Sequence, residues 1–338
     1  MNHTQRIEIV IAGQGLAGTM LGWELWKRDI PFRIFDPGIG NHSSMAAAGM
    51  FSLLAARRLK EMELAGPQYK VMKETFGEIG HELGQEFLHE VPTARLMSNE
   101  EIPAWKTAAQ GEIAHLVKKV HPDFKATGVI SGYGAAIIEP SGFIDLPEFL
   151  HSVREWMITK HLLINELIDY NSIKTSEDGF MINGHTKTRK VIFCEGPSIS
   201  NNPFFDYSDI RQNKGEWIEI EAPGFSQDHI IKKEIFILPL RNGRFRVGAT
   251  FRHGEMDPNP TLDARTELEK KLQSIINVPY QVTDHRAGIR PSSRNRLPVL
   301  GPHRNIPGLY IFNGLGSRGV LQAPWYAKIL CNEFGAQK

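Results

Sequence analysis

The feature that most constrains the fold is a glycine turn between an apolar run and an amphipathic segment near the N-terminus. Residues 7–12 are rich in β-branched side chains, as in a buried parallel strand. The turn reads Gly13-Gln14-Gly15-Leu16-Ala17-Gly18, and residues 16–28 then place apolar side chains at helical spacing. A second expected strand, 32–36, ends at Asp36. This order predicts a βαβ unit.

Each glycine of this turn has a physical reason to be glycine in a dinucleotide-binding unit. The first allows the tight turn, the second lets the backbone approach a pyrophosphate, and the third allows the helix to pack closely on the strand. The helix N-terminus stabilises phosphate charge, and a carboxylate such as Asp36 can accept hydrogen bonds from ribose hydroxyls. A glycine-rich turn that only packs an ordinary α/β sheet stays an alternative, and the turn alone does not distinguish FAD from NAD. The predicted contacts are Gly13, Gly15, Leu16, Ala17, Gly18 and Asp36.

Composition narrows the class of protein. A chain of 338 residues exceeds what one hydrophobic core usually organises, so we expect two closely packed domains. The 39 Lys and Arg residues nearly cancel the 38 Asp and Glu residues, so no overall field recruits nucleic acid or an anionic membrane. Cys194 and Cys331 form neither a disulfide framework nor a metal-ligand spacing. No apolar run approaches the ~18 residues of a membrane span. We expect a cytoplasmic protein with no metal site and no membrane partner.

The rest of the chain alternates between helical and strand patterns. From 216 to 250 the pattern is that of β-strands, and the pair Asn242-Gly243 indicates a hairpin. An antiparallel sheet is therefore expected as an insert between pieces of the nucleotide-binding unit. The other expected elements are a helix from about 65 to 90, a strand at 135–140, a helix at 147–160 begun by Asp145, a strand at 190–194 ended by Gly196-Pro197, and a strand at 308–312.

Several segments place small residues and glycines beside these strands. Ser43-Ser44-Met45-Ala46-Ala47-Ala48-Gly49-Met50 follows Asp36, and Gly314-Leu315-Gly316-Ser317-Arg318-Gly319 follows the strand at 308–312 and opens a helix. Lys214-Gly215-Glu216 enters the alternating region. In this order the segments resemble the D-amino-acid oxidase (DAO) superfamily of FAD-dependent oxidoreductases, particularly glycine oxidase and the oxidase domain of the tRNA methylaminomethyl-uridine biosynthesis enzyme. The resemblance covers nearly the whole chain.

The resemblance implies an α/β fold with an α+β insert: a Rossmann-like FAD-binding domain with an inserted, mostly antiparallel β-sheet substrate domain. Residues 1–80, 140–205 and 285–338 are assigned to the FAD-binding domain, and 81–139 and 206–284 to the substrate-binding domain. Non-covalent FAD is expected, because no cysteine lies near the segment that tethers the flavin in some relatives. The further FAD contacts that the resemblance implies are Ser43, Ser44, Ala48, Gly49, Met50, Gly196, Gly314, Gly316, Ser317, Arg318, Gly319 and Val320.

A basic segment near the C-terminus is similar to the family's substrate-holding segment. It reads Ala287-Gly288-Ile289-Arg290-Pro291 and continues to Arg294-Asn295-Arg296. In glycine oxidase-like members the arginine matching Arg290 holds the substrate carboxylate, a role for which a guanidinium supplies two parallel N–H donors. A structural ion pair is the alternative for Arg290.

This segment and the C-terminal glycine loop also depart from the family pattern. Asn295 stands where the family often has Asp. Ser317 stands where glycine oxidase has a further arginine, and Arg318 follows one residue later, so glycine itself is left open as the substrate. The predicted catalytic residues are Arg290 and Arg318.

These inferences predict FAD-dependent oxidation of an amine C–N bond by hydride transfer to flavin. The expected substrate is an amino acid or N-substituted glycine. No catalytic base is assigned, because the amine lone pair drives C–H cleavage, and water hydrolyses the imine product. One alternative is a tRNA wobble-uridine carboxymethylaminomethyl-modifying oxidase. A dehydrogenase that uses an acceptor other than oxygen and a non-enzymatic flavin-binding protein also stay open. For the tRNA alternative, the strip Arg286, Arg290, Arg294 and Arg296 with His285 reads either as a solvated surface or as phosphate contacts.

Overall fold

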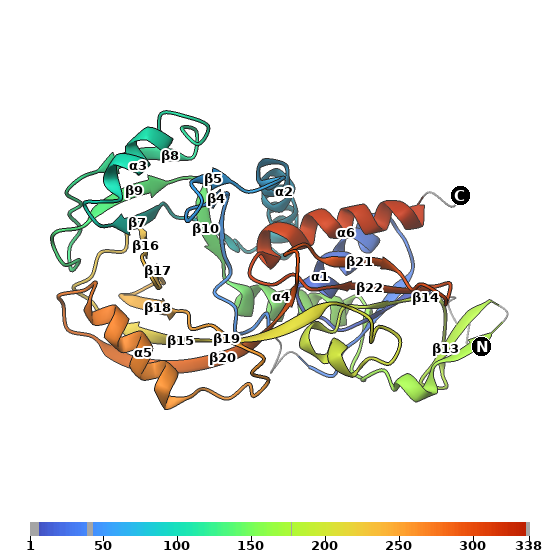
Figure 1. Cartoon of the computed structure of the whole chain (residues 1–338). Helices are drawn as coiled ribbons and strands as arrows, with labels where there is room; N and C mark the ends of the chain where they lie inside the picture. Colours follow the sequence, from blue (N-terminus) through green and yellow to red (C-terminus); the bar gives the residue numbers. More distant parts are fainter. Residues whose placement is uncertain (1–6, 39–42, 177, 336–338) are drawn as a thin grey trace.

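A computed structural model of the chain describes residues 7–38, 43–176 and 178–335 (Figure 1). Two large β-sheets dominate the fold, one of eight strands and one of nine. The eight-stranded sheet is flanked by long helices, and the nine-stranded sheet is mostly antiparallel. The predicted fold class, an α/β nucleotide-binding fold with an antiparallel sheet inserted, is confirmed.

The eight-stranded sheet contains the predicted βαβ unit. Strand β1 (Ile7–Ala12) lies parallel to β2 (Phe32–Phe35) and to β14 (Thr186–Phe193), and β22 (Leu309–Asn313) lies parallel to β14. Because parallel strands end at the same edge of a sheet, the segments that follow these strands meet at that edge, where such folds bind ligands. The remaining strands are β11 (Leu163–Ile164), β12 (Lys174–Ser176), β13 (Gly179–Ile182) and β21 (Val299–Pro302).

Helices bury one face of this sheet. The inward side chains of β1 and β2, such as Ile11 and Ile34, share one apolar core with helix residues such as Met20 and Phe149. On the opposite face, Val10 and Phe35 pack with other apolar side chains. The helices of the first face are α1 (Leu16–Lys27), α2 (Ala65–Leu83), α4 (Leu146–Thr159) and α6 (Gly319–Gly335), and the short 3₁₀ turns are η1 (Tyr170–Ser172) and η2 (Gly196–Asn201).

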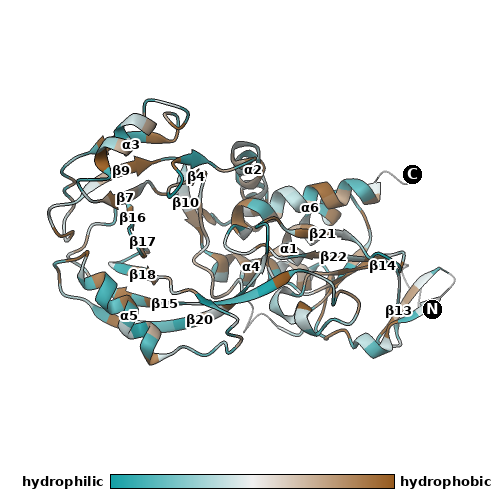
Figure 2. Cartoon of the chain, viewed as in Figure 1, coloured by the Kyte–Doolittle hydropathy of each residue, from teal (hydrophilic) through white to brown (hydrophobic). Residues whose placement is uncertain are grey.

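The nine-stranded sheet has one apolar face, which is covered by helix α5 (Leu262–Gln273), and one face with many polar residues. Figure 2 shows hydrophilic residues along parts of β18 and β20. The strand order is β19-β15-β18-β17-β16-β7-β9-β8, with β20 paired to β15. The strands are β7 (Thr93–Met97), β8 (Val117–His121), β9 (Gly134–Ile138), β15 (Ile210–Glu221), β16 (Ile230–Lys232), β17 (Phe236–Pro239), β18 (Arg244–Gly248), β19 (Arg252–His253) and β20 (Gln281–Ser293).

Smaller elements connect the strands of the two large sheets (Figure 1). Phe143 packs with Ile230 and Leu238 of the nine-stranded sheet and with Met50, so the small sheet and the large one share an apolar contact. These elements are the three-stranded sheet of β3 (Met50–Ser52), β10 (Ser141–Ile144) and β6 (Leu88–Glu90), the hairpin of β4 (Leu54–Ala55) and β5 (Lys60–Glu61), and helix α3 (Ile102–Ala108).

Most predicted elements are present, and one prediction is wrong. The Asn242-Gly243 turn joins β17 to β18 with positive φ at both residues (61° and 70°), and Asp145 caps α4 by accepting from the Glu148 N–H. The helix expected from about 65 to 90 ends instead at Leu83. Gly84 adopts a left-handed conformation there, and residues 88–90 form β6.

Candidate functional site

The glycine turn has the tight geometry that its spacing predicts. Gly13 has a φ of +97°, and a Cβ there would lie 2.8 Å from the Cys194 carbonyl oxygen. A Cβ on Gly18 would lie 1.9 Å from the Gly13 carbonyl oxygen, so α1 can approach β1 only if this residue is glycine. Gly15 is the N-cap of α1 and, as a glycine, has no side chain that could cap the helix. The helix therefore begins with amides suited to a phosphate group.

Asp36 is held at the carboxyl end of β2. Its carboxylate accepts hydrogen bonds from the backbone N–H groups of Gln14 (2.8 Å) and Gly38 (2.9 Å), and the side chain is 2% exposed. Arg154 of α4 forms an ion pair with it at 2.8 Å and also donates to the Gln14 side chain at 2.7 Å. Sequence reasoning missed Arg154, because its partner lies 118 residues earlier in the chain.

Residues 43–50 link the two large sheets. Ser44 Oγ accepts from the Leu16 N–H at the start of α1, and Ser43 Oγ donates to the Ile289 carbonyl of β20. Ala48 and Met50 pack in the apolar contact of Phe143, and Gly49 has a φ of +69°. A Cβ on Gly49 would lie 1.9 Å from the Ile144 carbonyl oxygen, so only glycine allows this close approach.

The C-terminal glycine loop lies against the same region. Gly314 and Gly316 have positive φ angles of 75° and 57°, and the Gly316 N–H donates to the Pro291 carbonyl at 2.9 Å. Gly319 begins α6, where its Cα lies close enough that a Cβ would be 3.1 Å from Leu16 Cδ2. The N-termini of α1 and α6 are therefore side by side.

The remaining predicted cofactor residues of this loop have different exposures. Val320 is buried, Ser317 is exposed and Arg318 is partly buried. Gly196 joins the same group, because the Asn313 side chain donates to its carbonyl at 3.0 Å. The structure thus brings together the four segments that carry the predicted cofactor contacts.

Arg290 lies on β20 beside this group, since its neighbours Ile289 and Pro291 accept the hydrogen bonds from Ser43 and Gly316. Its guanidinium lies over Gly215 of β15, where a Cβ would be 1.9 Å from the arginine Nη2. It also lies 5.7 Å from the centre of the Phe251 ring. Among the described residues no carboxylate lies within 4.0 Å, and burial lowers the pKa of the guanidinium. The structural ion pair considered as the alternative is therefore not found in the described part of the chain.

Arg318 lies in a cationic setting. Burial lowers the pKa of its guanidinium, and Arg296 and Arg58 lower that pKa further by charge repulsion. The basic residues between 285 and 296 do not form one continuous strip, because several of them have separate acidic partners. Arg286 pairs with Asp284 at 2.7 Å, and His285 lies 3.0 Å from the buried Glu216.

Arg246 of β18 is a further basic residue at the site, and sequence reasoning missed it. It is 7% exposed, lies 4.3 Å from the centre of the Trp217 ring, and donates to the Ala47 carbonyl at 3.4 Å. Trp217 Nε1 donates to the neighbouring Ala46 carbonyl at 2.6 Å. Both side chains therefore hold the segment 43–50 against the nine-stranded sheet. No local signal marked it, because Arg244 and Arg246 alternate with Phe245 and Val247 as in any half-buried strand.

Glu195 is a titratable group beside Gly196. Burial raises the pKa of this carboxyl to about 7, although hydrogen bonds from Asn202 and Tyr170 act in the opposite direction. Its charge therefore changes near neutral pH, next to the predicted cofactor segments.

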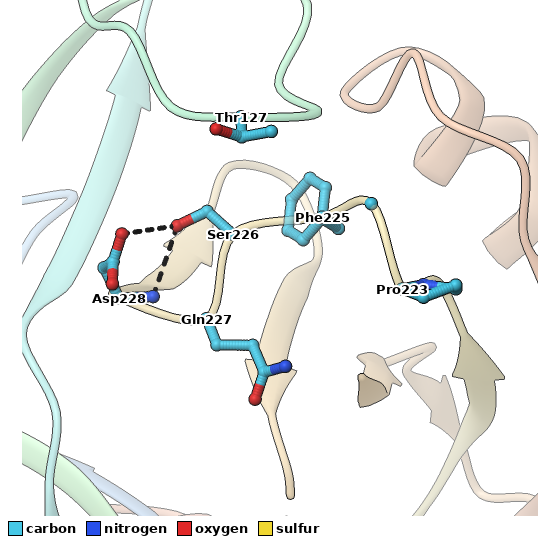
Figure 3. A pocket seen from close by; sticks show the side chains of 7 residues that line it. Thr127, Pro223, Phe225, Ser226, Gln227 and Asp228 are labelled. Carbon is cyan, nitrogen blue, oxygen red and sulfur yellow. Dashed lines mark hydrogen bonds between the residues drawn. The ribbon is translucent and has the colours of Figure 1, made fainter. Parts of the chain in front are cut away.

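Two hollows are lined by residues outside these segments. One of about 350 Å³ lies by the loop between β15 and β16, where Ser226 and Asp228 bond each other (Figure 3). Since its polar side chains already satisfy one another, it offers little chemistry. The second, of about 420 Å³, is lined by Ala56, Arg57, Leu59, Arg95, Glu101, Ala104 and Trp105.

Two structural findings concern membrane proteins and metal-binding proteins, two classes that the sequence already disfavours. Within residues 7–38, 43–176 and 178–335, no helix is long and apolar enough to cross a membrane. The same ranges hold no group of three His, Cys, Asp or Glu side chains suited to a metal ion.

The parallel sheet with its glycine turn, joined to an antiparallel sheet, defines a nucleotide-dependent enzyme of the flavoprotein type. A model of the DAO family, described as FAD dependent oxidoreductase, matches residues 8–333. The chain belongs to this family of FAD-dependent oxidoreductases, as its sequence pattern predicts.

Individual relatives agree with the family. The glycine oxidase of Geobacillus kaustophilus is 24% identical over 95% of this chain and 91% of that protein. The tRNA 5-methylaminomethyl-2-thiouridine biosynthesis bifunctional protein MnmC of Leptospira interrogans is 25% identical over 93% of this chain, which spans only 55% of that protein. The crystal structure of glycine oxidase from Bacillus cereus has the same fold, with a TM-score of 0.81, 19% identity and 98% coverage of both chains.

Proposed function

We propose that the chain oxidises the C–N bond of an amino acid or N-substituted glycine, with FAD bound across the junction of its two large sheets. The observation that carries this proposal is Arg290: a partly buried guanidinium without a carboxylate partner among the described residues, next to the glycine loop and to residues 43–50. An unpaired buried cation is costly unless an anion joins it. A substrate carboxylate supplies that anion.

The residues present fit FAD. The start of α1, where Gly15 provides no N-cap side chain, suits the pyrophosphate, and Asp36 lies at the end of β2, the position from which such folds contact the ribose. We assign the flavin ring to the space between residues 43–50 and the loop 314–320, with Gly196 nearby. The FAD-binding domain then comprises residues 1–80, 140–205 and 285–338, and the substrate-binding domain 81–139 and 206–284.

Non-covalent binding of the cofactor is supported by the cysteines. Cys194 and Cys331 are both buried, and burial raises the pKa of each thiol, to about 12 for Cys331. A thioether bond needs an accessible thiolate. Neither cysteine meets that requirement.

Bound FAD supplies an acceptor for the hydride of the substrate. The protein contributes orientation: Arg290 clamps the carboxylate through two parallel hydrogen bonds, so that the neighbouring C–H is aimed in one direction. The ring of Phe251 lies beside the guanidinium, 5.7 Å from it, and bounds this contact on one side. The amine must be neutral to release the hydride, and no side chain is assigned as a base. The imine product then hydrolyses in water.

A tRNA-modifying oxidase is the second candidate. It is favoured by the similarity to MnmC and by the mutual proximity of Arg58, Arg296 and Arg318, whose charges could contact phosphates. The near-zero net charge of the chain favours a small molecule instead.

The test is an anaerobic reduction screen. Purified protein loaded with FAD is mixed with glycine, sarcosine, D- and L-amino acids, or tRNA lacking the modification, and loss of the flavin absorbance is followed. We expect reduction by small amino acids, and peroxide on reoxidation would identify oxygen as the acceptor. Reduction by tRNA alone, with a steep dependence on salt, would favour the second candidate.

Arg290→Ala tests the anchor. Loss of a buried charge pair costs about 2–5 kcal/mol, so the substrate constant should rise roughly thirty- to several-thousand-fold with unchanged FAD content. Arg265→Ala on the exposed helix α5 is the control and should leave the kinetics unchanged. Unchanged substrate kinetics in Arg290→Ala would remove this residue from the site.

A further inference from the structure

The strand register places a row of residues on one face of the nine-stranded sheet. Paired residues on neighbouring strands point to the same side, and the chain of pairs runs from Arg286 to Trp217, Gly248, Phe236, Lys232 and Arg95. Arg290 lies four residues after Arg286 on β20, and Arg246 lies two residues before Gly248 on β18, so both share this face.

This face of the sheet packs against residues 48–50. Ile230, two residues before Lys232, packs with Phe143 in the cluster that includes Ala48 and Met50. The neighbours that alternate with the row, such as Ile231 and Ala94, belong instead to the apolar core under α5. The basic residues of the row therefore lie on the same side of the sheet as Arg290 and the assigned flavin space.

Lys232 is a cation on this face, paired with Arg95 of the neighbouring strand. Its side chain is exposed, yet burial by surrounding protein is the largest cause that lowers its pKa, followed by Arg95 and Arg57. No carboxylate lies within 4.0 Å of Lys232 among the described residues.

The positive charges of its neighbours Arg95 and Arg57 are also not fully neutralised by carboxylates among the described residues. Arg95 pairs with Glu101 through Nη2 at 3.2 Å, but its Nη1 is buried and has no hydrogen-bond partner. Arg57 has no ion pair in the described part of the chain. Both arginines and Glu101 line the hollow of about 420 Å³. Three cations thus face one carboxylate, and like charges so arranged repel one another unless an anion binds.

We propose that Lys232, together with Arg95 and Arg57, binds a second anionic group of the substrate, whose α-carboxylate is held by Arg290. The substrate class is then an amino acid or N-substituted glycine with a second acidic group, such as a second carboxylate. This inference rests on the proposed function for the role of Arg290. It explains why the same face carries two separate sets of basic residues.

The first experiment measures binding without turnover. FAD-loaded protein is titrated with acetate and with the dicarboxylates malonate, succinate and glutarate, and binding is followed by the change in the flavin spectrum. At least one dicarboxylate should bind about tenfold or more tightly than acetate. Lys232→Met should weaken that dicarboxylate by about ten- to a hundredfold and leave acetate unchanged. Lys232→Arg keeps the charge and should retain the preference.

The matched control is Lys233→Met. Lys233 is the next residue, but its side chain donates to the Tyr133 hydroxyl at 2.9 Å and lies 4.6 Å from that ring's centre. The Lys233→Met variant should therefore bind both acetate and the dicarboxylate as the wild type does. A dicarboxylate preference that is absent, or that persists equally in Lys232→Met, would overturn the assignment.

The second experiment compares rates of anaerobic flavin reduction for matched amines. Sarcosine is compared with N-(carboxymethyl)glycine, and alanine with aspartate and glutamate in both configurations. The dianionic partner should react faster at low concentration in the wild type, and Lys232→Met should remove this advantage. If no amine reduces the flavin but dicarboxylates still bind through Lys232, the oxidation fails and the anion site stands. If monoanionic amines react best in both proteins, the anion site fails and the oxidation stands.

Discussion

At the scale of single residues, glycine positions decide where the functional side chains can lie. Gly215 has no φ that requires glycine, yet the guanidinium of Arg290 occupies the space in which its Cβ would stand. On a face where other strand residues carry large side chains, this position opens the sheet for the arginine. A glycine in a strand interior often marks such a close approach.

Gly215→Ala should therefore displace Arg290 without unfolding the protein, because the atoms that must move are the far end of a flexible side chain. We expect the substrate constant to rise by about tenfold or more, since a bidentate contact depends on geometry. Steady-state kinetics with the best small substrate measure this change, and FAD content should stay constant.

Gly77→Ala in α2 is the matched control for this substitution. A Cβ there meets nothing within 4 Å, so kinetics should be unchanged. A Gly215→Ala enzyme with the substrate constant of the wild type would show that Arg290 does not hold the substrate from its observed position.

At the scale of elements, two helix N-termini meet at one edge of the parallel sheet. Leu16 at the start of α1 contacts Gly319 at the start of α6, although the two residues come from opposite ends of the chain. Both helices aim their N-terminal amides toward the region assigned to FAD, where the positive ends of the helix dipoles favour negative charge. The turn of the βαβ unit fixes the position of the first helix.

Gly18→Ala should disturb this turn, because its Cβ would lie 1.9 Å from backbone, which cannot move aside as a side chain can. We expect FAD affinity to fall by about tenfold or more, together with a lower melting temperature. Fluorescence titration of the apoprotein with FAD measures the affinity.

Alanine at a helical glycine normally stabilises by up to about 1 kcal/mol, as the control Gly77→Ala should do. A Gly18→Ala protein that binds FAD like the wild type would contradict the assignment of the pyrophosphate to this turn.

At the scale of the whole molecule, residues 43–50 and the loop 314–319 tie the two large sheets together. Ser43 bonds β20, Ser44 bonds the start of α1, and Gly316 bonds the Pro291 carbonyl. A cofactor bound among these segments would contact elements from both sheets. Its binding energy would then stabilise the molecule as a unit.

Removal of FAD should therefore lower the melting temperature, and added FAD should restore it in a concentration-dependent way. At a hundred times the dissociation constant the gain is about 2.7 kcal/mol. Calorimetry of the apoprotein over a range of FAD concentrations measures it. FMN, which lacks the AMP part, should stabilise less because Asp36 gains no ribose and the start of α1 meets one phosphate instead of a pyrophosphate. A melting temperature that is independent of FAD would argue against the cofactor site.

The sequence alone determined the features that depend on local backbone geometry. The Gly13 to Gly18 turn, the Asn242-Gly243 hairpin and the Asp145 cap all rest on φ angles or hydrogen bonds between near neighbours in the chain. The end of α2 at Leu83 was missed, because apolar spacing continued past the left-handed Gly84. Arg290 was identified only through the family resemblance.

Only the tertiary structure decided which distant residues share a site. Arg154 reaches Asp36 from α4, Gly215 makes room for Arg290, and Lys232 lies beside Arg95 through the pairing of β16 with β7. The packing of α4 on the sheet sets the first contact, and strand register sets the other two; both depend on whole sheets rather than on any local pattern. The sequence supplies each charged side chain, but only the fold determines which of them lie together at the proposed substrate site.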